Sequence, residues 1–463
     1  MKKLKQVFSV LICVALCLPL LSCSISSRSI RFSTGSDGLS SGSMWSIPSL
    51  NDPLIVGRYR IGNPYEFVDW ETYGQYKADF HAHSTISDGK NTVAEMLERY
   101  YSAGFSIVAI TDHNYLTKSW DQVDTGAISK ERAVEMASGK DRNGLGMIGM
   151  TNSIEQSRAE HINSFFAEYN NPPNAKISNT LAAVEAFGGI TFLDHVGRYT
   201  GGLVGGSVGA DASNDPLMIQ KYVDMFNDHG SCVGMEIVNS LDNESRSDRI
   251  LWDNILSRTM PDGRFVWGFA NGDSHGIDRI GYSFNIMLMP SLSLEGTRLA
   301  MERGTFYAVS RVSRPDGINS TLPNGDDMPG SGTNKTLYLL EQPMPGITGI
   351  VVDQWNCSIT IAGTDYDRIE WIADGVVIAT GERLDLNKYH EDIGCYVRAQ
   401  LKSRTGIAYT QPFSIKKLVP SVGKTAAGEQ YQTIMSPLSE YQAAVLRKTL
   451  KGTVHLFSQC RFC

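Results

Sequence analysis

The chain contains 463 residues, of which 42% are hydrophobic and 20% charged, and it carries a formal net charge of −7. This composition is that of a soluble globular protein with room for two or three domains. Because phosphate backbones are bound by clustered Lys and Arg, and the sequence has no such cluster, nucleic acid is not expected as a partner.

Residues 1–23 predict an export signal that is cleaved at its C-terminal end. A basic start, "MKKLK", precedes the apolar stretch "VFSVLICVALCLPLL", which is short for a membrane-spanning helix. "LLSC" then ends at Cys23 and resembles the lipobox of bacterial lipoproteins, which implies a lipid on Cys23. The alternative is an ordinary signal peptide cleaved nearby. Both predict export, and the first predicts a lipoprotein anchored to the membrane on the periplasmic or cell-surface side.

Residues 24–52 are rich in Ser and Gly and predict a flexible tether. Between about 77 and 310, short apolar runs alternate with helical periodicity, which is typical of βα units around a mainly parallel sheet. The main strands are expected at "DFHAH", "FSIVAIT", "GMIGMTNSIE", "GITFLDH", "CVGMEIVN" and "RFVWGFANGDSH". The first helix should begin after Asn91 or Thr92, end at Gly104 and bury Val93, Met96, Leu97, Tyr100 and Tyr101.

Six to eight such units suggest a barrel, and barrel enzymes place their chemistry at the C-terminal ends of the strands. The predicted strand ends carry His83, His113, Glu155, His195, Asp273 and His275. In "HAH", the period of two directs His81 and His83 to the same side of the strand, so both can bind one ion. Imidazole and carboxylate groups converging from different strands favour a multinuclear Zn²⁺, Mn²⁺ or Fe²⁺ site.

Five motifs, in this order and at these spacings, are similar to those of the polymerase and histidinol phosphatase (PHP) family: "HAHSTISDG", "AITDHN", "SIEQS", "LDHVGR" and "NGDSHG". The resemblance covers about residues 60–311, within a predicted domain at 53–314, and implies a distorted (β/α)7 barrel that binds two or three divalent metal ions. It implies a first metal held by His81, His83, Glu155 and Asp273, a second by Glu155, His161 and His195, and a third by Asp88, His113 and His275. His161 follows "EQSRAE", which also fits a helix, so a surface histidine is the alternative there.

Other polar residues lie beside these motifs. Asp112 is expected to orient His113 or to cap a turn, because metal-bound imidazoles usually have an oxygen acceptor on the other nitrogen. Arg198 either binds a phosphate through its fork of donors or is a solvated loop residue. Glu236 ends a predicted strand, where it can contact metal, substrate or another side chain of the site. The glycine-rich residues 201–209 predict a mobile flap.

After residue 314, short alternating strands replace the helical periodicity, which predicts a small all-β sandwich of immunoglobulin type over 315–418. Trp371 suits the buried Trp of its third strand, and Tyr396 suits the tyrosine corner. Arg398 stands where an immunoglobulin cysteine would be, so no inter-sheet disulfide is expected there. The tail at 419–463 contains one amphipathic stretch and has no predicted role.

These features predict a metal-dependent phosphoesterase in which a metal-activated water hydrolyses a phosphomonoester or phosphodiester at a di- or trinuclear site. The expected substrate is a small phosphorylated molecule, and the candidate catalytic residues are Glu155, His195 and Arg198. An amide or carbamate hydrolase with the same ligands stays open; a cationic pocket of Arg198 with Arg279 or Arg311 would favour phosphate. A non-catalytic surface binding module is the alternative from another class, although every expected ligand position is filled.

Overall fold

A computed structural model describes residues 59–123, 126–198, 212–240, 245–311, 342–403 and 405–418. The chain divides into two units, Met1–Pro53 and Leu54–Cys463, and all described residues belong to the second. The predicted export signal, tether, flap and C-terminal tail therefore lie outside the described residues. No helix in the described ranges combines the length and the apolar character that crossing a membrane requires.

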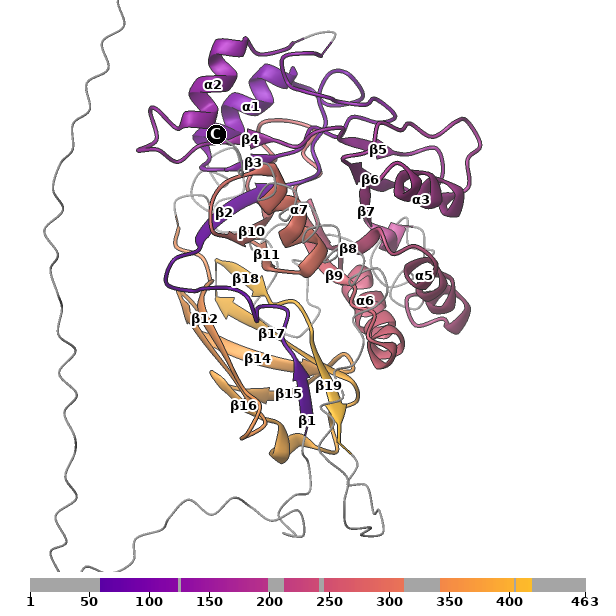
Figure 1. Cartoon of the computed structure of the whole chain (residues 1–463), viewed down its shortest axis with the longest axis vertical. Helices are drawn as coiled ribbons and strands as arrows, with labels where there is room; N and C mark the ends of the chain where they lie inside the picture. Colours follow the sequence, from indigo (N-terminus) through magenta and orange to yellow (C-terminus); the bar gives the residue numbers. More distant parts are fainter. Residues whose placement is uncertain are drawn as a thin grey trace, which may run out of the picture. The chain divides into compact units, whose positions relative to one another are not determined.

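One sheet contains, in this order, β5 (Ile154–Gln156), β6 (Ile162–Phe165), β7 (Ile190–Leu193), β8 (Cys232–Asn239) and β9 (Trp267–Asn271) (Figure 1). Strands β7 to β9 run parallel, whereas β6 runs antiparallel to both of its neighbours. Its helices are α3 (Ile177–Ala186), α5 (Pro216–Asp228) and α6 (Ser245–Thr259). Helices α5 and α6 pack against β8 and against each other, which buries the apolar residues of this parallel strand.

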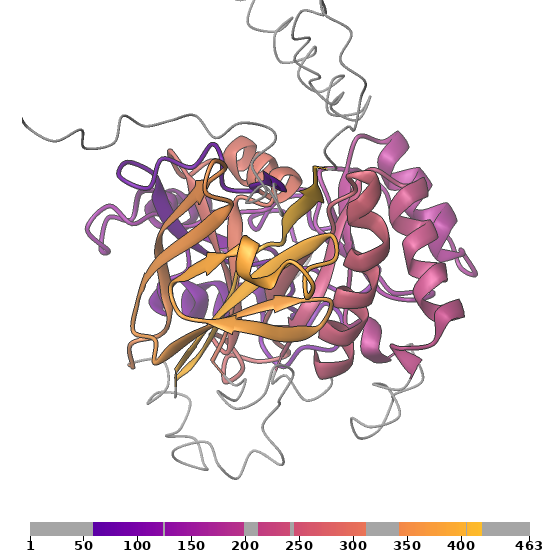
Figure 2. The ribbon, with the colours of Figure 1, turned by 90° about the horizontal axis from the view of Figure 1, so that it is seen from below.

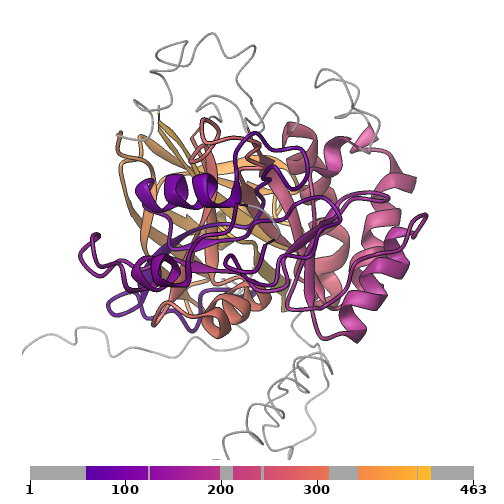
Figure 3. The same cartoon turned by 90° about the horizontal axis from the view of Figure 1, so that it is seen from above.

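A second sheet contains the short parallel strands β4 (Ile148–Gly149), β3 (Ile107–Val108) and β2 (Gly74–Asp79). It continues into the antiparallel strands β10 (Ser283–Met289) and β11 (Phe306–Ser310). The helices of this part are α1 (Val93–Ser102), α2 (Lys130–Ser138) and α7 (Leu294–Arg303). Figure 3 shows the molecule from the end that carries α1 and α2.

Helix α1 illustrates how local sequence specifies these elements. The Thr92 hydroxyl accepts from the Glu95 N–H, and the Glu95 carboxylate accepts from the Thr92 N–H, which forms a capping box. All five residues of the predicted apolar face are buried. Gly104 follows with a φ of 83°, a left-handed conformation that glycine adopts without steric cost. The expected N-cap, apolar face and end of this helix are confirmed.

A distorted (β/α)7 barrel was predicted, but the described residues form separate sheets and no closed barrel. No continuous ladder joins the two sheets; they are linked by isolated bridges, including Ala82 to Ser274 and His113 to Glu155. The predicted strand "GMIGMTNSIE" is divided into β4 and β5, which lie in different sheets. Strands of two or three residues offer too few hydrogen bonds to extend a ladder around a barrel. The bridges nevertheless hold together the strand ends that carry the predicted ligands.

The strands after residue 342 share a sheet with the first part of the chain. Strand β18 (Gly406–Tyr409) pairs with β11 and with β17 (Tyr396–Ser403), and β17 pairs with β14 (Arg368–Ala373). Strand β1 (Tyr59–Gly62) pairs with β19 (Phe413–Lys417). The other strands, visible in Figure 2, are β15 (Val376–Thr380), which pairs with β14, and the three-stranded sheet of β12 (Gly346–Asp353), β13 (Ser358–Thr364) and β16 (Arg383–Asp385).

Three residues test the details expected of the C-terminal strands. Trp371 lies on β14 and is fully buried, as predicted. The Tyr396 hydroxyl donates to Asp253 Oδ1 of α6 at 2.9 Å, so it does not form the expected tyrosine corner with the backbone just before it. Arg398 is fully buried, and its Nε and Nη2 each lie 2.7 Å from an oxygen of Asp253. Arg398, which forms an ion pair with Asp253 of helix α6, thus stands where an immunoglobulin domain has a cysteine.

Candidate metal centre

The structure brings all nine predicted ligands into one cluster, which we call the metal cluster: His81, His83, Asp88, His113, Glu155, His161, His195, Asp273 and His275. Most of them lie just before or just after a strand, whereas Glu155 lies within β5 and Asp88 in a loop after β2. His81 and His83 follow β2, His195 follows β7, and Asp273 and His275 follow β9. His161 directly precedes β6, in a hairpin with β5, and not on the alternative helix. Five segments distant in sequence therefore meet at one place.

Glu155 lies at the centre of the metal cluster, and its side chain is fully buried. Its Oε2 lies 2.7 Å from His113 Nδ1 and 3.3 Å from His83 Nε2. Its Oε1 lies 2.6 Å from His161 Nδ1 and 3.4 Å from His195 Nε2. A buried carboxylate surrounded by imidazole nitrogens offers the donor set that divalent metal ions prefer, so this arrangement fits a carboxylate that would bind metal.

His81, His83 and Asp273 form a second group of ligand atoms. The two Nε2 atoms lie 3.1 Å apart, and Asp273 Oδ1 lies 3.4 Å from His81 Nε2 and 3.1 Å from His83 Nε2. All three side chains are at most 5% exposed. The expectation that "HAH" directs both imidazoles to the same side is confirmed.

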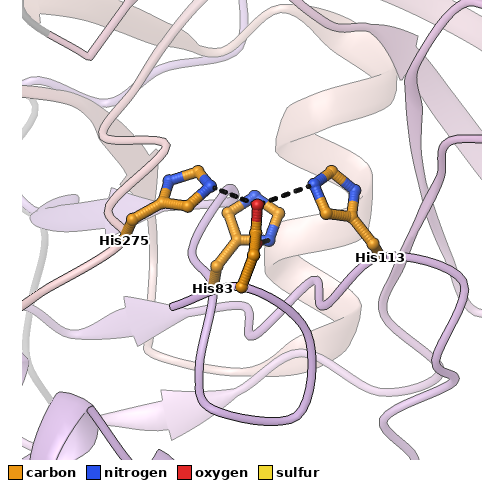
Figure 4. Close-up of side chains that lie close together, drawn as sticks. His83, His113 and His275 are labelled. Atoms are coloured by element: carbon orange, nitrogen blue, oxygen red, sulfur yellow. Dashed lines mark hydrogen bonds and ion pairs between the residues drawn. The ribbon is translucent and has the colours of Figure 1, made fainter. Parts of the chain in front are cut away.

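The third group lies at the exposed side of the metal cluster. Asp88 Oδ2 lies 3.2 Å from His275 Nε2 and 3.5 Å from His113 Nε2 (Figure 4). The ring of His83 stacks on that of His275 with centroids 4.3 Å apart, and Figure 4 shows it between the two other histidines. The Asp88 side chain is 53% exposed, so this group faces solvent. His113 contacts both Asp88 and Glu155, which connects this group to the centre.

A network from Asp112 holds the loop that carries Asp88. The Asp112 carboxylate accepts hydrogen bonds from the N–H of Ser84 at 2.8 Å and from the hydroxyls of Ser84 and Ser87 at 2.6 Å. A Cβ at Gly89 would lie 2.6 Å from the His83 carbonyl oxygen, so only glycine fits there. Asp112 was expected either to orient His113 or to cap a turn, and these hydrogen bonds assign it to capping the turn.

Sequence reasoning missed Asp194, which directly precedes His195. Its side chain is buried, its Oδ1 accepts from Asn163 Nδ2 at 3.1 Å, and the same oxygen lies 4.0 Å from His81 Nδ1. Burial raises the pKa of Asp194 well above its usual range, against the effect of His81. Asp194 could have been identified from the sequence, because it directly precedes a predicted ligand at the end of a buried strand.

Asp79, at the end of β2, was missed as well. It accepts hydrogen bonds from the Tyr100 hydroxyl at 2.8 Å and from the Gly272 N–H at 3.0 Å. Burial raises the pKa of Asp79 to about 7, against these hydrogen bonds. Asp79 therefore ties the ends of β2 and β9 together just before their ligands.

Two of the predicted ligands have an unusual backbone. His195 has a φ of 29° and Asp273 a φ of 43°, in the left-handed region that few residues other than glycine adopt. Such conformations cost on the order of 1–3 kcal/mol each and persist where the surrounding structure imposes them. Both residues thus carry local strain at a site where their side chains converge.

The buried groups shift one another's pKa. Burial alone would lower the pKa of His81, but the carboxylates of Asp273, Glu236 and Glu155 raise it well above its usual value. Burial also opposes the charge on Glu155, yet His81 and the other histidines lower its pKa well below the usual range. Burial lowers the pKa of His113, and contact with Glu155 more than reverses this. Protons are therefore favoured on the imidazole nitrogens that face the carboxylates, where they compete with metal ions.

Acidification is expected to release bound metal, because ligation requires neutral imidazole. Because the pKa values of His81 and His113 are raised, protons compete with metal ions for their nitrogens at a higher pH than they would at an isolated histidine. Metal affinity should therefore already fall as the pH drops through neutrality. Calorimetric titration with Mn²⁺ or Zn²⁺ at about pH 8, 7 and 6 measures this effect, and equal affinity at all three values would contradict it.

The cations considered for a phosphate pocket lie in different surroundings. Arg198 belongs to the 3₁₀ helix η1 (Val196–Arg198), and its side chain lies outside the described residues. Arg311 is buried and donates to the Gln342 carbonyl at 3.1 Å, which gives it a structural contact. Arg279 is 43% exposed. Lys90, which sequence reasoning missed, is exposed, and its N–H donates to the His275 carbonyl at 2.8 Å.

The fold and the metal cluster define a mixed α/β protein with a buried set of His, Asp and Glu ligands. No protein-family model and no curated protein matches the chain. A two-domain protein from Bacteroides vulgatus, containing a predicted PHP-like metal-dependent phosphoesterase, is 14% identical with a TM-score of 0.39, over 76% of this chain and 89% of that one.

Two other solved structures are similar over about half of this chain. A lesion-specific endonuclease from Pyrococcus furiosus is 15% identical with a TM-score of 0.31, over 50% of this chain and 56% of that one. An amidohydrolase from Chromobacterium violaceum with bound sulfate is 14% identical with a TM-score of 0.28, over 43% and 87%. The activity of this chain is therefore inferred from its own side chains.

Proposed function

We propose that the protein is a metal-dependent phosphoesterase that uses two or three divalent ions to hydrolyse a phosphomonoester or phosphodiester. The observation that carries this proposal is the buried carboxylate of Glu155, with imidazole nitrogens from four histidines within 3.4 Å of its oxygens. Nitrogen and carboxylate donors of this kind suit Zn²⁺, Mn²⁺ or Fe²⁺. Such a concentration of ligands is costly to bury without a cation, which supports an enzyme over a scaffold that only binds a partner.

Three groups of side chains would hold the ions. They are His81, His83, Asp273 and Glu155 for the first, Glu155, His161 and His195 for the second, and Asp88, His113 and His275 for the third, and all these residues belong to the overlapping groups of ligand atoms in the metal cluster. When bound, such ions lower the pKa of water toward neutrality and offset negative charge on a phosphoryl group. Glu155 would connect the first two groups. The exposed Asp88 and His275 mark the side from which a substrate can enter.

A phosphorylated substrate is supported over a neutral amide or carbamate by Lys90, which is exposed and whose backbone N–H donates to the His275 carbonyl. Arg279 is also exposed, but it pairs with Asp278 at 3.8 Å. Positive charge beside the entrance raises the local concentration of an anionic substrate. Arg198, three residues after His195 in the sequence, is proposed as a further phosphate ligand because its guanidinium can form paired hydrogen bonds.

The cellular location is proposed from the N-terminal sequence. A basic start, a short apolar stretch and "LLSC" support export and attachment to a membrane through lipid on Cys23. The enzyme would then act on phosphoesters outside the cytoplasm.

The proposed reaction can be tested with a panel of a phosphomonoester, a phosphodiester and an aryl carbamate. The chain without residues 1–24 would be loaded with Mn²⁺ or Zn²⁺ and compared with His195→Ala and with His229→Ala. His229 lies outside the metal cluster, 3.8 Å from Glu185, and serves as the matched control. We expect phosphoester turnover in the wild type and His229→Ala, and its loss in His195→Ala. Turnover of the carbamate alone would assign the protein to amide chemistry, and no turnover would favour a binding module.

A further inference from the structure

Glu236 lies on β8, and its buried carboxylate accepts hydrogen bonds from four donors. Oε1 accepts from His81 Nδ1 at 2.9 Å and from Asn271 Nδ2 at 2.9 Å. Oε2 accepts from the His195 N–H at 2.9 Å and from Asn239 Nδ2 at 2.8 Å. These donors lie at or just after the ends of four strands, β7, β8 and β9 of one sheet and β2 of the other. No other carboxylate among the described residues is shown to join four strand ends in this way.

We infer that Glu236 is a positioning residue that prepares both His81 and His195 for metal binding, an inference that rests on the proposed metal site. By accepting from Nδ1 of His81, Glu236 fixes the tautomer in which Nε2 carries the lone pair. That Nε2 faces His83 and Asp273, where an ion would be held. A second hydrogen bond, to the His195 N–H, holds the backbone of His195 at its strained φ of 29°.

A carboxylate is required at this position, because all four partners are donors. A glutamine has one acceptor oxygen and one NH₂ group, so two of the four donors would face another donor in either orientation of the amide. Leaving buried donors without an acceptor is costly. The isosteric Glu236→Gln change should therefore disturb either His81 together with Asn271, or His195 together with Asn239.

The effect should be selective within the metal cluster. No hydrogen bond of Glu236 within the described ranges reaches Asp88, His113 or His275. Asp88 lies on the loop that Asp112 caps, His113 directly follows Asp112, and His275 follows β9. Removing the carboxylate should weaken the ions held through His81 and His195 and leave the third group unchanged.

Calorimetric titration of the metal-free chain without residues 1–24 tests this inference with Mn²⁺ and Zn²⁺. Binding events are assigned by comparison with His81→Ala, His195→Ala and His275→Ala. In Glu236→Gln, we expect the events assigned to His81 and His195 to weaken by about 10–100-fold, the range typical of partners that support metal ligands. The His275 event should stay within about twofold of the wild type. Glu370→Gln is the matched control, because Glu370 is a buried carboxylate on β14 that pairs with Lys402.

Two results would overturn the inference. One is an unchanged isotherm in Glu236→Gln; the other is equal weakening of every event with a lower Tm of the metal-free protein, as a purely structural role predicts. Should Glu236→Gln not fold, Asn239→Ala removes one donor and keeps the carboxylate, and a weaker His195 event with an unchanged His275 event is expected. The titration contains no substrate, so it measures metal binding separately from hydrolysis. If metal binding weakens selectively in Glu236→Gln while the protein hydrolyses no phosphoester, the positioning role of Glu236 is supported and the proposed reaction is rejected.

Discussion

Glu155→Gln is expected to abolish the proposed hydrolysis and to reduce metal binding more strongly than any other single change. The Glu155 oxygens contact His83 and His113 on one side and His161 and His195 on the other. An amide lacks the negative charge and would turn an NH₂ group toward two of these imidazoles. We expect metal affinity to fall by more than about 100-fold, the upper end of the effect of residues that only support a ligand. Metal analysis after dialysis and phosphoester turnover measure both effects.

Glu370→Gln is the matched control for this change as well. It removes a buried carboxylate from β14 that accepts from Gln400 and Lys402, outside the metal cluster. We expect it to alter stability while metal content and turnover stay near those of the wild type. Metal content in Glu155→Gln within about twofold of the wild type would contradict a central role for this carboxylate.

Asp253→Leu is expected to destabilise the protein by about 3–5 kcal/mol, the typical cost of leaving a buried charge without its partner. Arg398 is fully buried and makes two hydrogen bonds of 2.7 Å to Asp253, which is itself only 3% exposed. The same carboxylate accepts from the Tyr396 hydroxyl. Leucine supplies no acceptor for either group. The free energy of unfolding from urea titration of the metal-free protein measures this loss.

The double variant Asp253→Leu, Arg398→Met should recover most of that stability, because both charges are then removed from the buried site. Glu98→Gln provides a surface comparison. Glu98 is 49% exposed and pairs with Arg132, so this change should alter stability by less than about 1 kcal/mol. A loss below about 1 kcal/mol for Asp253→Leu would show that the buried pair does not hold the C-terminal strands to α6.

Helix α6 connects this ion pair to the metal cluster. Its Asp253 and Ser257 contact the C-terminal strands, Ser257 through a 3.0 Å hydrogen bond to Asp374. At the other end of the helix, Asp248 accepts from the Gly197 N–H, two residues after His195. The C-terminal strands therefore contact the same helix that supports a predicted ligand. An independently folding domain would not make this contact.

Local sequence patterns were sufficient to predict the elements whose structure depends on residues close together in the chain. The apolar face of α1 follows from helical periodicity, and β8 occupies the predicted segment "CVGMEIVN" because a strand covered on both faces is mostly apolar. By contrast, "EHINSF" forms β6 through pairing with β5 and β7, and no pattern within the segment distinguished that hairpin from a helix. The helix α2 was not predicted at all.

The sequence by itself determined which residue types are available for metal binding and that they stand at strand ends, because these follow from local order along the chain. Only the tertiary structure decided that Glu236 joins His81 to His195, that Asp194 lies beside them, and that two sheets form without closing into a barrel. It also decided that Arg398 finds its partner on α6. Each of these depends on groups far apart in sequence, whose contacts are set by the packing of whole strands and helices.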